Sequence, residues 1–299
     1  MIRLFNIERF ATHDGPGIRS VIFFQGCSLN CPWCANPEGK VRKPQLLYDV
    51  HKCINCRWCE VSCPQKAIDW DNNHFHWDFH KCLGCAKCVN NCPKEAIQLF
   101  GKLMRAEEII KVVLKDKDYY DNSGGGITLS GGEVLMQAAA AYDLLKRAKQ
   151  ANLHTAMETT LNALWCDIEP LIAVCDLFMV DLKHDDADIF LQVCNGDLNL
   201  IKDNIKRLAE RVSDKMIIRI PVIPGFNDEE KTLIKMFEFC AGLDLKRIDL
   251  LPYHTLGKNK YEKLGQLYGW SVDKMLNPKA LNKYIAIANN YGIDLQIGG

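Results

Sequence analysis

The sequence lacks an excess of charge of either sign, because its 37 basic and 37 acidic side chains leave a formal net charge of zero at pH 7. A phosphate backbone is attracted by a positive field, so nucleic acid is not expected as a partner. The chain also lacks any run close to the roughly 20 apolar residues that a membrane span requires. Its start, MIRLFNIERF, has no basic segment leading into an apolar stretch. We therefore expect a cytoplasmic protein without a membrane partner.

Cysteine, in contrast, is abundant, with 15 among 299 residues. In a secreted protein this number would indicate disulfides, but the missing signal segment and the clustered spacing favour metal ligation in a reducing compartment. With 48% hydrophobic residues, the chain can bury one large core and still form a smaller unit. Four cysteines fit no cluster spacing and are predicted to be buried thiols: Cys166, Cys175, Cys194 and Cys240.

An internal repeat organises the first third of the chain. Eight cysteines fall into two runs of identical spacing, each followed directly by proline: Cys53, Cys56, Cys59 and Cys63, then Cys82, Cys85, Cys88 and Cys92. A repeat of this kind predicts two copies of one small structural unit. We place both copies in an inserted α+β module at residues 48–101, within a larger domain formed by residues 1–47 and 102–299.

Outside the insert, apolar runs rich in β-branched residues alternate with helical patterns. The six runs are residues 20–25, 126–130, 154–159, 177–182, 216–222 and 247–251. Between them, segments such as 135–150 carry leucines and alanines at helical spacing. This alternation predicts a parallel sheet with right-handed crossovers. The remaining chain is too short for eight such units, so the predicted fold is α/β, a partial (β/α)6 barrel.

Three more cysteines, Cys27, Cys31 and Cys34, follow the first of these runs. Three thiolates can hold three irons of a cubane and leave the fourth iron open to a ligand. Zinc is the alternative, but zinc normally takes a fourth cysteine or histidine nearby, and the following residues ANPEGK offer none. The spacing resembles that of radical S-adenosylmethionine (SAM) enzymes. The resemblance implies that SAM chelates the open iron and that Trp33 lies near its adenine.

The repeated runs resemble those of bacterial two-cluster ferredoxins, where the fourth cysteine of each run ligates the other cluster. The resemblance implies two auxiliary 4Fe-4S clusters, and hence three clusters in the chain. One cluster would take Cys53, Cys56, Cys59 and Cys92, and the other Cys82, Cys85, Cys88 and Cys63. A pair of structural zinc ions is the alternative. The expected role is electron relay to the catalytic cluster, with a structural or docking role as the alternative.

A glycine-rich segment, Ser130 to Glu133, lies where the second run ends and a helical pattern begins. Gly131 and Gly132 would let a ligand approach the backbone closely. The Glu133 carboxylate can accept hydrogen bonds from an ammonium group. Most Gly-Gly turns are only turns, but after the three cysteines this segment resembles the part of radical SAM enzymes that receives the SAM amino group.

Two further strand ends carry charged or polar side chains. In the fourth run, Asp181 and Lys183 point to one face and Leu182 to the other, because side chains alternate along a strand. Such a pair can bind a ligand that carries both charges, as SAM does. His254, after the sixth run, can donate a hydrogen bond to a ribose or a carboxylate. Each could be an ordinary solvated strand end, but the carboxyl ends of parallel strands meet at one edge.

Six motifs, in order, resemble the glycyl radical enzyme activating enzymes over essentially the whole chain. They are DGPGIR at 14–19, CPWCANPE at 31–38, SGGE at 130–133, DLK at 181–183, RIPVIPGFND at 219–228 and LLPYHTLGKNKY at 250–261. The inserted module resembles the longer members of this family. The resemblance implies cleavage of SAM to methionine and a 5′-deoxyadenosyl radical, which takes a hydrogen atom from a glycine of a partner glycyl radical enzyme. A donor such as flavodoxin or ferredoxin would supply the electron.

The same resemblance implies roles for individual residues. SAM contacts would come from Trp33, Cys34, Ala35, Gly132, Asp181, Leu182, Lys183 and His254. Asp14 and the segment from Arg219 to Gly225 would line the path of the partner's glycine loop or the cofactor. A monovalent cation near the SAM carboxylate would be held by Glu158, Thr159, Met179 and Asp181. Ala35 and Glu158 stand where the best-known member, pyruvate formate-lyase activating enzyme, has a histidine and an aspartate.

Two other functions are compatible with parts of the sequence. A radical SAM enzyme that modifies a small molecule or a ribosomal peptide would need substrate contacts in the barrel mouth, which the loops PVIPGFND and HTLGKNKY do not decide. The ferredoxin-like repeat alone would also permit an electron-transfer protein. Such a protein would have no use for an open three-cysteine site beside SGGE and DLK.

Overall fold

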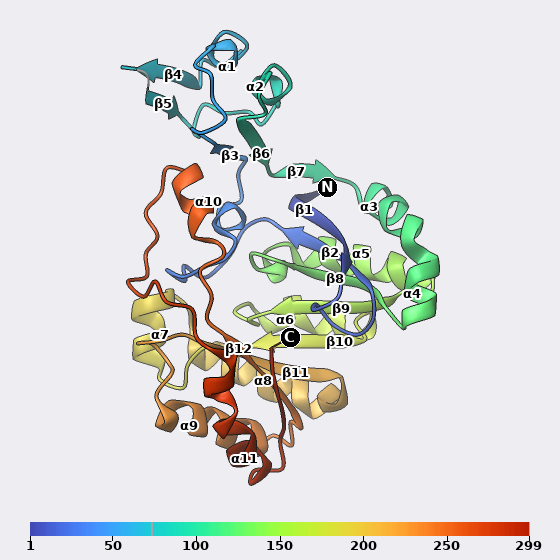
Figure 1. Cartoon of the computed structure of the whole chain (residues 1–299). Helices are drawn as coiled ribbons and strands as arrows, with labels where there is room; N and C mark the ends of the chain where they lie inside the picture. The colour runs from blue at the N-terminus through green and yellow to red at the C-terminus, as the bar shows by residue number, and fades with distance from the viewer. Residues whose placement is uncertain (73, 299) are drawn as a thin grey trace.

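The computed structural model of the protein describes residues 1–72 and 74–298. Its body is a nine-stranded sheet in the order β13-β12-β11-β10-β9-β8-β2-β1-β7 (Figure 1). Seven neighbouring strands are parallel: β2 (Arg19–Phe24), β8 (Gly126–Gly131), β9 (His154–Thr159), β10 (Leu177–Asp181), β11 (Met216–Val222), β12 (Arg247–Pro252) and β13 (Asp294–Ile297). Two antiparallel strands extend the sheet beyond β2: β1 (Ile2–Ala11) and β7 (Lys102–Met104).

All six strands expected from the sequence are present, each to within one residue at either end. The predicted number of parallel strands is one too few, because β13 adds a seventh beside β12. β13 has only four residues, of which Leu295 is buried, so its sequence signal is weak and its pairing with β12 defines it. β1 and β7 were not expected either. The main architecture, an α/β fold on a mostly parallel sheet, agrees with the prediction.

Helices connect the strands and bury apolar stripes against the sheet. In α8 (Leu198–Val212) the buried positions include Leu198, Ile201, Ile205 and Leu208, which recur at the spacing of one helical face. Asp197 begins this helix, since its side chain accepts a hydrogen bond from the Leu200 amide. The other helices are α3 (Ala106–Val113), α4 (Lys117–Ser123), α5 (Ala138–Gln150), α6 (Trp165–Ile168), α7 (Ala187–Cys194), α9 (Glu230–Ala241), α10 (Lys258–Lys263) and α11 (Lys283–Asn289).

A smaller unit lies at the top of Figure 1, joined to the body near β7. It contains two antiparallel pairs and two one-turn helices: β3 (Gln45–Tyr48) with β6 (Ile97–Phe100), β4 (Ile68–Asp71) with β5 (His74–Trp77), α1 (Trp58–Val61) and α2 (Lys87–Asn90). Its own core includes Leu46, Ile68 and Ile97. The repeat is visible in the backbone, since Arg57 and Ala86, at equivalent positions of the two cysteine runs, both have φ of 59°. The boundaries 48–101 stay a prediction.

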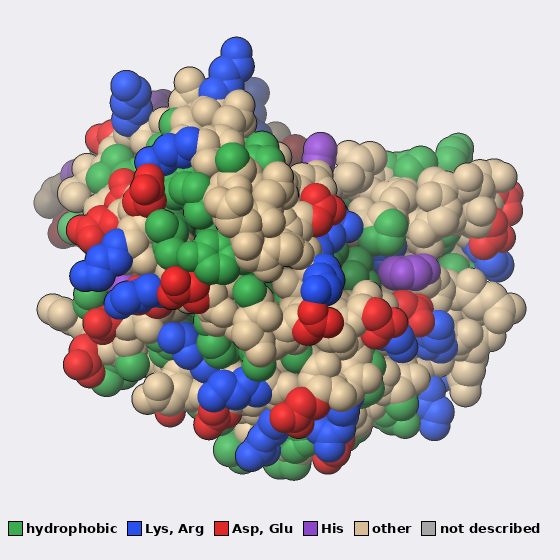
Figure 2. Space-filling view, turned by 90° about the horizontal axis from the view of Figure 1, so that it is seen from below, with side chains coloured by type: hydrophobic (Ala, Val, Ile, Leu, Met, Phe, Trp, Pro, Cys, Tyr) green, Lys and Arg blue, Asp and Glu red, His purple; other side chains and the backbone are tan. Residues whose placement is uncertain are grey.

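Charge is distributed evenly on the outside of the molecule. Figure 2 shows basic and acidic side chains interspersed over the face seen from below, without a large area of one sign. This pattern matches the formal net charge of zero. Within the described ranges, every helix is too short or too polar to cross a membrane.

Candidate active site

A cavity of about 270 Å³ lies between the cysteine loop and the carboxyl ends of the parallel strands. Most of the predicted site residues line it: Cys27, Cys31, Trp33, Cys34, Ala35, Gly131, Gly132, Glu158, Thr159, Asp181, Lys183, Arg219 and His254. They come from segments that are widely separated along the chain. The parallel sheet brings them together because its strands end at the same edge.

Backbone hydrogen bonds hold the cysteine loop as it leaves β2. The Gly26 amide donates to the Gly39 carbonyl over 2.7 Å, and the Cys27 amide donates to the Lys40 carbonyl over 2.9 Å. The Lys40 ammonium donates in turn to the Cys31 carbonyl over 2.8 Å. The loop therefore closes on itself, and its three thiols face the cavity from a fixed frame.

Two of these thiols receive contacts from backbone amides. The Leu29 amide lies 3.4 Å from the Cys27 sulfur, and the Asn36 amide lies 3.4 Å from the Cys34 sulfur. Amide donors of this kind stabilise negative charge on a metal-bound thiolate. This donor set fits a 4Fe-4S cluster held by three cysteines.

A fourth cysteine, Cys194 at the end of α7, lies beside this loop. Its carbonyl accepts a hydrogen bond of 2.7 Å from the Asn30 amide. Its thiol forms a hydrogen bond with Cys31, which lowers the pKa of the Cys31 thiol. The prediction from the sequence that Cys194 is a buried thiol is correct. The sequence did not indicate that this thiol lies beside the cysteine loop. For Cys166 the prediction is wrong, because that side chain is exposed on the short helix α6.

Trp33, between the last two cysteines of the loop, packs in an aromatic cluster. Its ring centroid lies 4.6 Å from that of Phe226 and 5.1 Å from that of Trp270. The side chain is buried but still borders the cavity. It therefore serves the core and also presents an aromatic edge to a ligand.

Gly131 and Gly132 lie where β8 ends against the cysteine loop. A Cβ on Gly132 would lie 2.2 Å from the Gly26 carbonyl oxygen, and one on Gly131 would lie 2.4 Å from the Phe24 oxygen. Gly131 also has φ of 117°, which L side chains rarely adopt. Both glycines are required by close backbone packing, independently of any ligand.

The Glu133 side chain does not line the cavity and already has four hydrogen-bond donors, so its expected role as acceptor for an ammonium group stays a prediction. Its carboxylate is buried and accepts hydrogen bonds from the Thr159 hydroxyl (2.6 Å) and from the Thr160 amide (2.9 Å) and hydroxyl (2.6 Å). It also accepts one from the Leu135 amide (3.1 Å) at the start of the following helical turn. Glu133 therefore ties the end of β8 to the end of β9.

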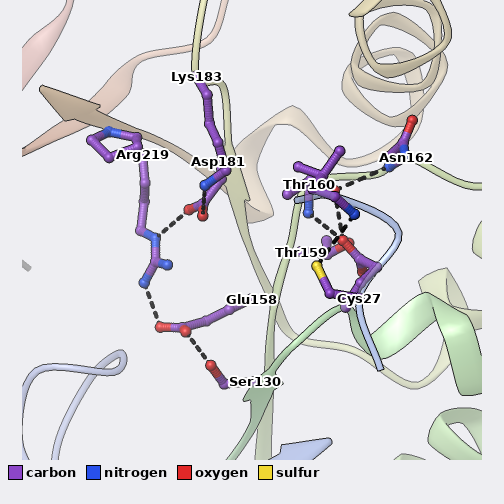
Figure 3. A network of polar contacts seen from close by, with 12 residues as sticks. Cys27, Ser130, Glu158, Thr159, Thr160, Asn162, Asp181, Lys183 and Arg219 are labelled. Atoms are coloured by element: carbon purple, nitrogen blue, oxygen red, sulfur yellow. Dashed lines mark hydrogen bonds and ion pairs between the residues drawn. The ribbon is translucent and has the colours of Figure 1, made fainter. Parts of the chain in front are cut away.

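Four charged side chains form a connected network on the wall facing the cysteine loop (Figure 3). Arg219 donates to Asp181 over 2.9 Å and to Glu158, and Lys183 donates to Asp181 over 2.7 Å. Glu158 also accepts from the Ser130 hydroxyl. Burial alone would raise the pKa of Asp181, but Arg219 and Lys183 hold it at about 2. Asp181 therefore stays ionised beside the two cations, and this wall offers both signs of charge to a ligand.

The four residues expected to hold a monovalent cation have other partners. The Arg219 guanidinium lies between Glu158 and Asp181. The Thr159 hydroxyl donates to Glu133, and Met179 packs in a small buried apolar cluster. The position that a cation would share with these carboxylates is thus taken by a side-chain cation in this structure.

Two predicted residues border the site without lining the cavity. The Leu182 side chain is fully buried, and its amide donates to the Arg219 carbonyl over 2.9 Å. The Asp14 carbonyl accepts a hydrogen bond of 2.6 Å from the Thr128 hydroxyl. Burial and the neighbouring Glu158 raise the pKa of the Asp14 carboxyl to about 6. Asp14 is thus close enough to sense the charge network.

Comparison with known proteins assigns the family. The Radical SAM superfamily model matches residues 21–237. The choline trimethylamine-lyase activating enzyme of Oleidesulfovibrio alaskensis is 35% identical over 98% of this chain and 97% of its own. The trans-4-hydroxy-L-proline dehydratase activating enzyme of Clostridioides difficile is 37% identical over 98% of each chain. The pyruvate formate-lyase 2-activating enzyme of Escherichia coli is 33% identical over 99% of this chain and 92% of its own. The chain belongs to the glycyl radical enzyme activating enzymes.

A solved structure supports the fold of this activating enzyme. Streptococcus suis SuiB bound to the precursor peptide SuiA superimposes with a TM-score of 0.53 at 14% identity, over 66% of this chain and 43% of that one. At this identity the likeness concerns the fold alone. Membership of the radical SAM superfamily implies SAM and a SAM-binding 4Fe-4S cluster, which the donor set at Cys27, Cys31 and Cys34 fits.

The smaller unit of this activating enzyme gathers its eight repeated cysteines around two small cavities. We name them the first cradle, with Cys53, Cys56, Cys59 and Cys92, and the second cradle, with Cys63, Cys82, Cys85 and Cys88. Each cradle thus combines three cysteines of one run with the last cysteine of the other, in the grouping expected from the sequence. Across residues 1–72 and 74–298, no three His, Cys, Asp or Glu side chains converge as ligands of a single metal ion.

Sequence reasoning missed three further residues that contact the site. Lys260 on α10 donates to Glu38 over 2.7 Å and to Asn36 over 3.0 Å, and the Tyr261 hydroxyl donates to the Cys34 carbonyl. Cys194 is the third. Lys260 and Tyr261 lay inside a motif that suggested the family, but nothing in their spacing indicated that α10 would clamp the cysteine loop.

Proposed function

We propose that this protein activates a partner glycyl radical enzyme. The observation that carries the proposal is the juxtaposition in one cavity of three thiols with the Asp181, Lys183 and Arg219 charges. With a reduced cluster and SAM bound, the cofactors supply a 5′-deoxyadenosyl radical, with release of methionine, and this radical takes a hydrogen atom from a glycine of the partner. The relatives named above as activating enzymes support this assignment.

The residues of the chain position the reactants and exclude water. The three cysteines would hold three irons and leave one for the amino and carboxylate groups of SAM. Asp181 and Lys183 would bind the charged groups of SAM, with Arg219 keeping Asp181 ionised. Trp33, Cys34, Ala35, Gly132 and His254 line the same cavity and would contact the rest of the cofactor. Holding the reacting groups at fixed separation is the main contribution that a protein makes to such a reaction.

We further propose that residues 48–101 form an inserted ferredoxin-like module on a partial barrel of the radical SAM type. The first and second cradles would each hold one auxiliary 4Fe-4S cluster, in the arrangement of bacterial two-cluster ferredoxins. These clusters would receive electrons from a donor such as flavodoxin or ferredoxin. Arg219 in the cavity wall and Asp14 beside it would line the path of the partner's glycine loop.

The decisive test is anaerobic. Reconstituted protein is mixed with dithionite, SAM and either choline trimethylamine-lyase or trans-4-hydroxy-L-proline dehydratase, the enzymes that the relatives' names specify. We expect a glycine-centred doublet in the electron paramagnetic resonance spectrum of a matching partner, together with 5′-deoxyadenosine. Cys31→Ala should abolish both products.

A matched variant, Cys240→Ala, removes a buried thiol in α9 outside the cavity and should leave both products unchanged. If Cys31→Ala formed as much of both products as the unsubstituted protein, the radical mechanism would be contradicted. Abundant 5′-deoxyadenosine without a doublet on any partner of a broad panel would favour modification of a small molecule or peptide instead.

A further inference from the structure

Two buried indole N–H groups in the smaller unit have no hydrogen-bond partner. Among the described residues, Trp70 Nε1 and Trp77 Nε1 are the only buried side-chain donors in this state. A buried donor left unpaired destabilises the fold, because it has given up its hydrogen bonds to water without gaining another partner. Two such costs in one small unit indicate that an acceptor absent from the polypeptide completes the structure.

Each indole borders a different cradle. Trp70 lines the first cradle and Trp77 lines the second. Both belong to the β4–β5 hairpin, where Trp70 pairs with Phe75 and Trp77 pairs with Ile68. These four side chains lie on one face of the hairpin, because residues two apart in a strand point the same way. That face packs in the same small core as Cys59 and Cys88.

The Trp70 indole lies in the wall of the first cradle. Trp70 lines that cradle together with Cys53, Cys56, Cys59 and Cys92, and its N–H has no hydrogen-bond partner in the polypeptide. An acceptor held by these cysteines would therefore lie beside the unpaired donor. Cluster sulfide and bound thiolate sulfur are the acceptors that this position would offer.

The backbone donors of the two cradles are equivalent. In each cradle, one amide contacts the first cysteine of a run and one contacts the last cysteine of the other run. The contacts are Asn55 to Cys53 (3.4 Å) and Ala96 to Cys92 (3.2 Å) in the first cradle, and Gly84 to Cys82 (3.4 Å) and Ala67 to Cys63 (3.3 Å) in the second. Backbone amides therefore give the cradles no reason to differ.

The side-chain donors break this equivalence. When the two cysteine runs are aligned, Tyr48 corresponds to Trp77 and Trp70 corresponds to Leu99. The first cradle therefore contains Tyr48 and Trp70, both with a polar hydrogen, whereas the second contains Trp77 and the apolar Leu99. Tyr48 lines the first cradle, and a phenol hydroxyl can donate a hydrogen bond to an acceptor bound there.

We propose that Trp70 and Trp77 each donate an N–H···S hydrogen bond to an auxiliary 4Fe-4S cluster, and that Tyr48 adds a donor at the first cradle only. Hydrogen bonds to cluster sulfur stabilise the more negative, reduced form, so the cluster in the first cradle has the higher reduction potential. The inference rests on the proposed function, since it requires both auxiliary clusters. It assigns the three side chains as positioning and tuning residues for electron delivery.

The test uses the full chain with Cys27, Cys31 and Cys34 replaced by Ala, so that only the auxiliary clusters contribute. Potentials are measured by anaerobic redox titration with electron paramagnetic resonance detection. Trp70→Phe should lower the higher potential alone, and Trp77→Phe the lower potential alone. For one lost hydrogen bond, we expect the ratio of reduced to oxidised cluster at a fixed potential to fall roughly fivefold.

Trp58→Phe is the matched control, because it removes an exposed indole next to Cys59 that lines neither cradle. It should leave both potentials unchanged. Iron analysis separates the two levels of failure: a chain that binds no iron in the cradles contradicts the auxiliary clusters. If Trp70→Phe and Trp77→Phe keep their full iron content and their potentials are unchanged, the proposed N–H···S hydrogen bonds are wrong, although the clusters are present. The same conclusion follows if both variants change the potential of the same cluster.

The Trp substitutions could prevent cluster assembly, so a second measurement uses the protein with both tryptophans intact. In the same background, the reduced clusters are examined by electron-nuclear double resonance in H2O and in D2O. We expect a strongly coupled exchangeable proton on each cluster beyond those of the backbone amides, with one more at the first cradle. Equal sets of exchangeable protons on the two clusters would contradict the proposed asymmetry.

Discussion

The Tyr261 hydroxyl donates a hydrogen bond of 3.0 Å to the carbonyl oxygen of Cys34, although 227 residues separate the two positions. Burial raises the pKa of Tyr261, so the phenol remains a donor at any working pH. Together with Lys260, this contact fixes α10 against the cysteine loop. The cysteine loop is therefore held from outside by α10, an element more than 200 residues further along the chain.

Removing this hydrogen bond should loosen the loop and weaken SAM binding. For Tyr261→Phe we expect the dissociation constant of SAM to rise about fivefold, because one hydrogen bond contributes about 1 kcal/mol. Isothermal titration with reconstituted protein measures it. Tyr119→Phe, on the exposed side of α4, is the control. Equal affinities for the wild type and Tyr261→Phe would show that the clamp does not affect the site.

Glu133 should prove to be a stabilising residue and not a SAM ligand. Glu133→Ala leaves buried donors of Thr159 and Thr160 without an acceptor, so we expect the free energy of unfolding to fall by about 3 kcal/mol. Denaturant titration under anaerobic conditions measures this loss. SAM affinity in the folded fraction should change less than the stability does. If Glu133→Ala lost SAM affinity while its free energy of unfolding stayed unchanged, Glu133 would be a SAM ligand, as expected from the sequence.

Arg219 should stabilise two buried carboxylates at once. Arg219→Met leaves Asp181 and Glu158 without their shared cation, which should cost about 3–5 kcal/mol of the free energy of unfolding. In the double variant Arg219→Met, Glu158→Met, the unpaired Glu158 carboxylate is gone while Asp181 keeps Lys183, so the combined loss should be smaller than the sum of the single losses. Simple additivity in this double-mutant cycle would contradict the network drawn in Figure 3.

Asp14 should make the stability depend on pH in a mildly acidic window. Its pKa is raised from 3.8 to about 6 in the folded protein, so the native state holds this proton more tightly than the unfolded chain. The stabilisation is complete below about pH 4 and is lost as the pH rises through 6. Because the carboxyl is partly exposed, we expect an effect on the order of 1 kcal/mol.

Asp14→Asn should remove this dependence. Denaturation at pH 5 and pH 7.5 would then show a larger decrease in stability for the wild type than for the variant. Parallel decreases in the two proteins would mean that the carboxyl titrates near its ordinary pKa.

The grouping of the cysteines and the main sheet could be predicted because their signals are local. The spacing of Cys27, Cys31 and Cys34 is a property of one loop, and the six runs that became strands carry their own apolar pattern. The exceptions are equally physical. The four-residue strand β13 has too few residues for a pattern, and β1 and β7 depend on which neighbour they pair with.

The partners of individual side chains could not be predicted in the same way. Glu133 and Glu158 both follow or end strands and carry the same carboxylate, yet one binds the threonines of the next strand end and the other binds Arg219. Cys194 looked like an ordinary core thiol and lies beside Cys31. The distance between strand ends in the folded protein decides which side chains form hydrogen bonds. The separation of two residues along the chain does not indicate that distance.

The amino-acid sequence by itself determined the grouping of eleven cysteines into one set of three and two sets of four, and the succession of strands along the chain. Those features depend on short-range spacing and on alternation along one segment. Only the tertiary structure decided which charges neutralise one another, which glycines are forced by backbone contact, and which cradle contains the additional donor. Such properties arise where distant segments approach within a few ångströms, and packing of the whole sheet fixes that approach.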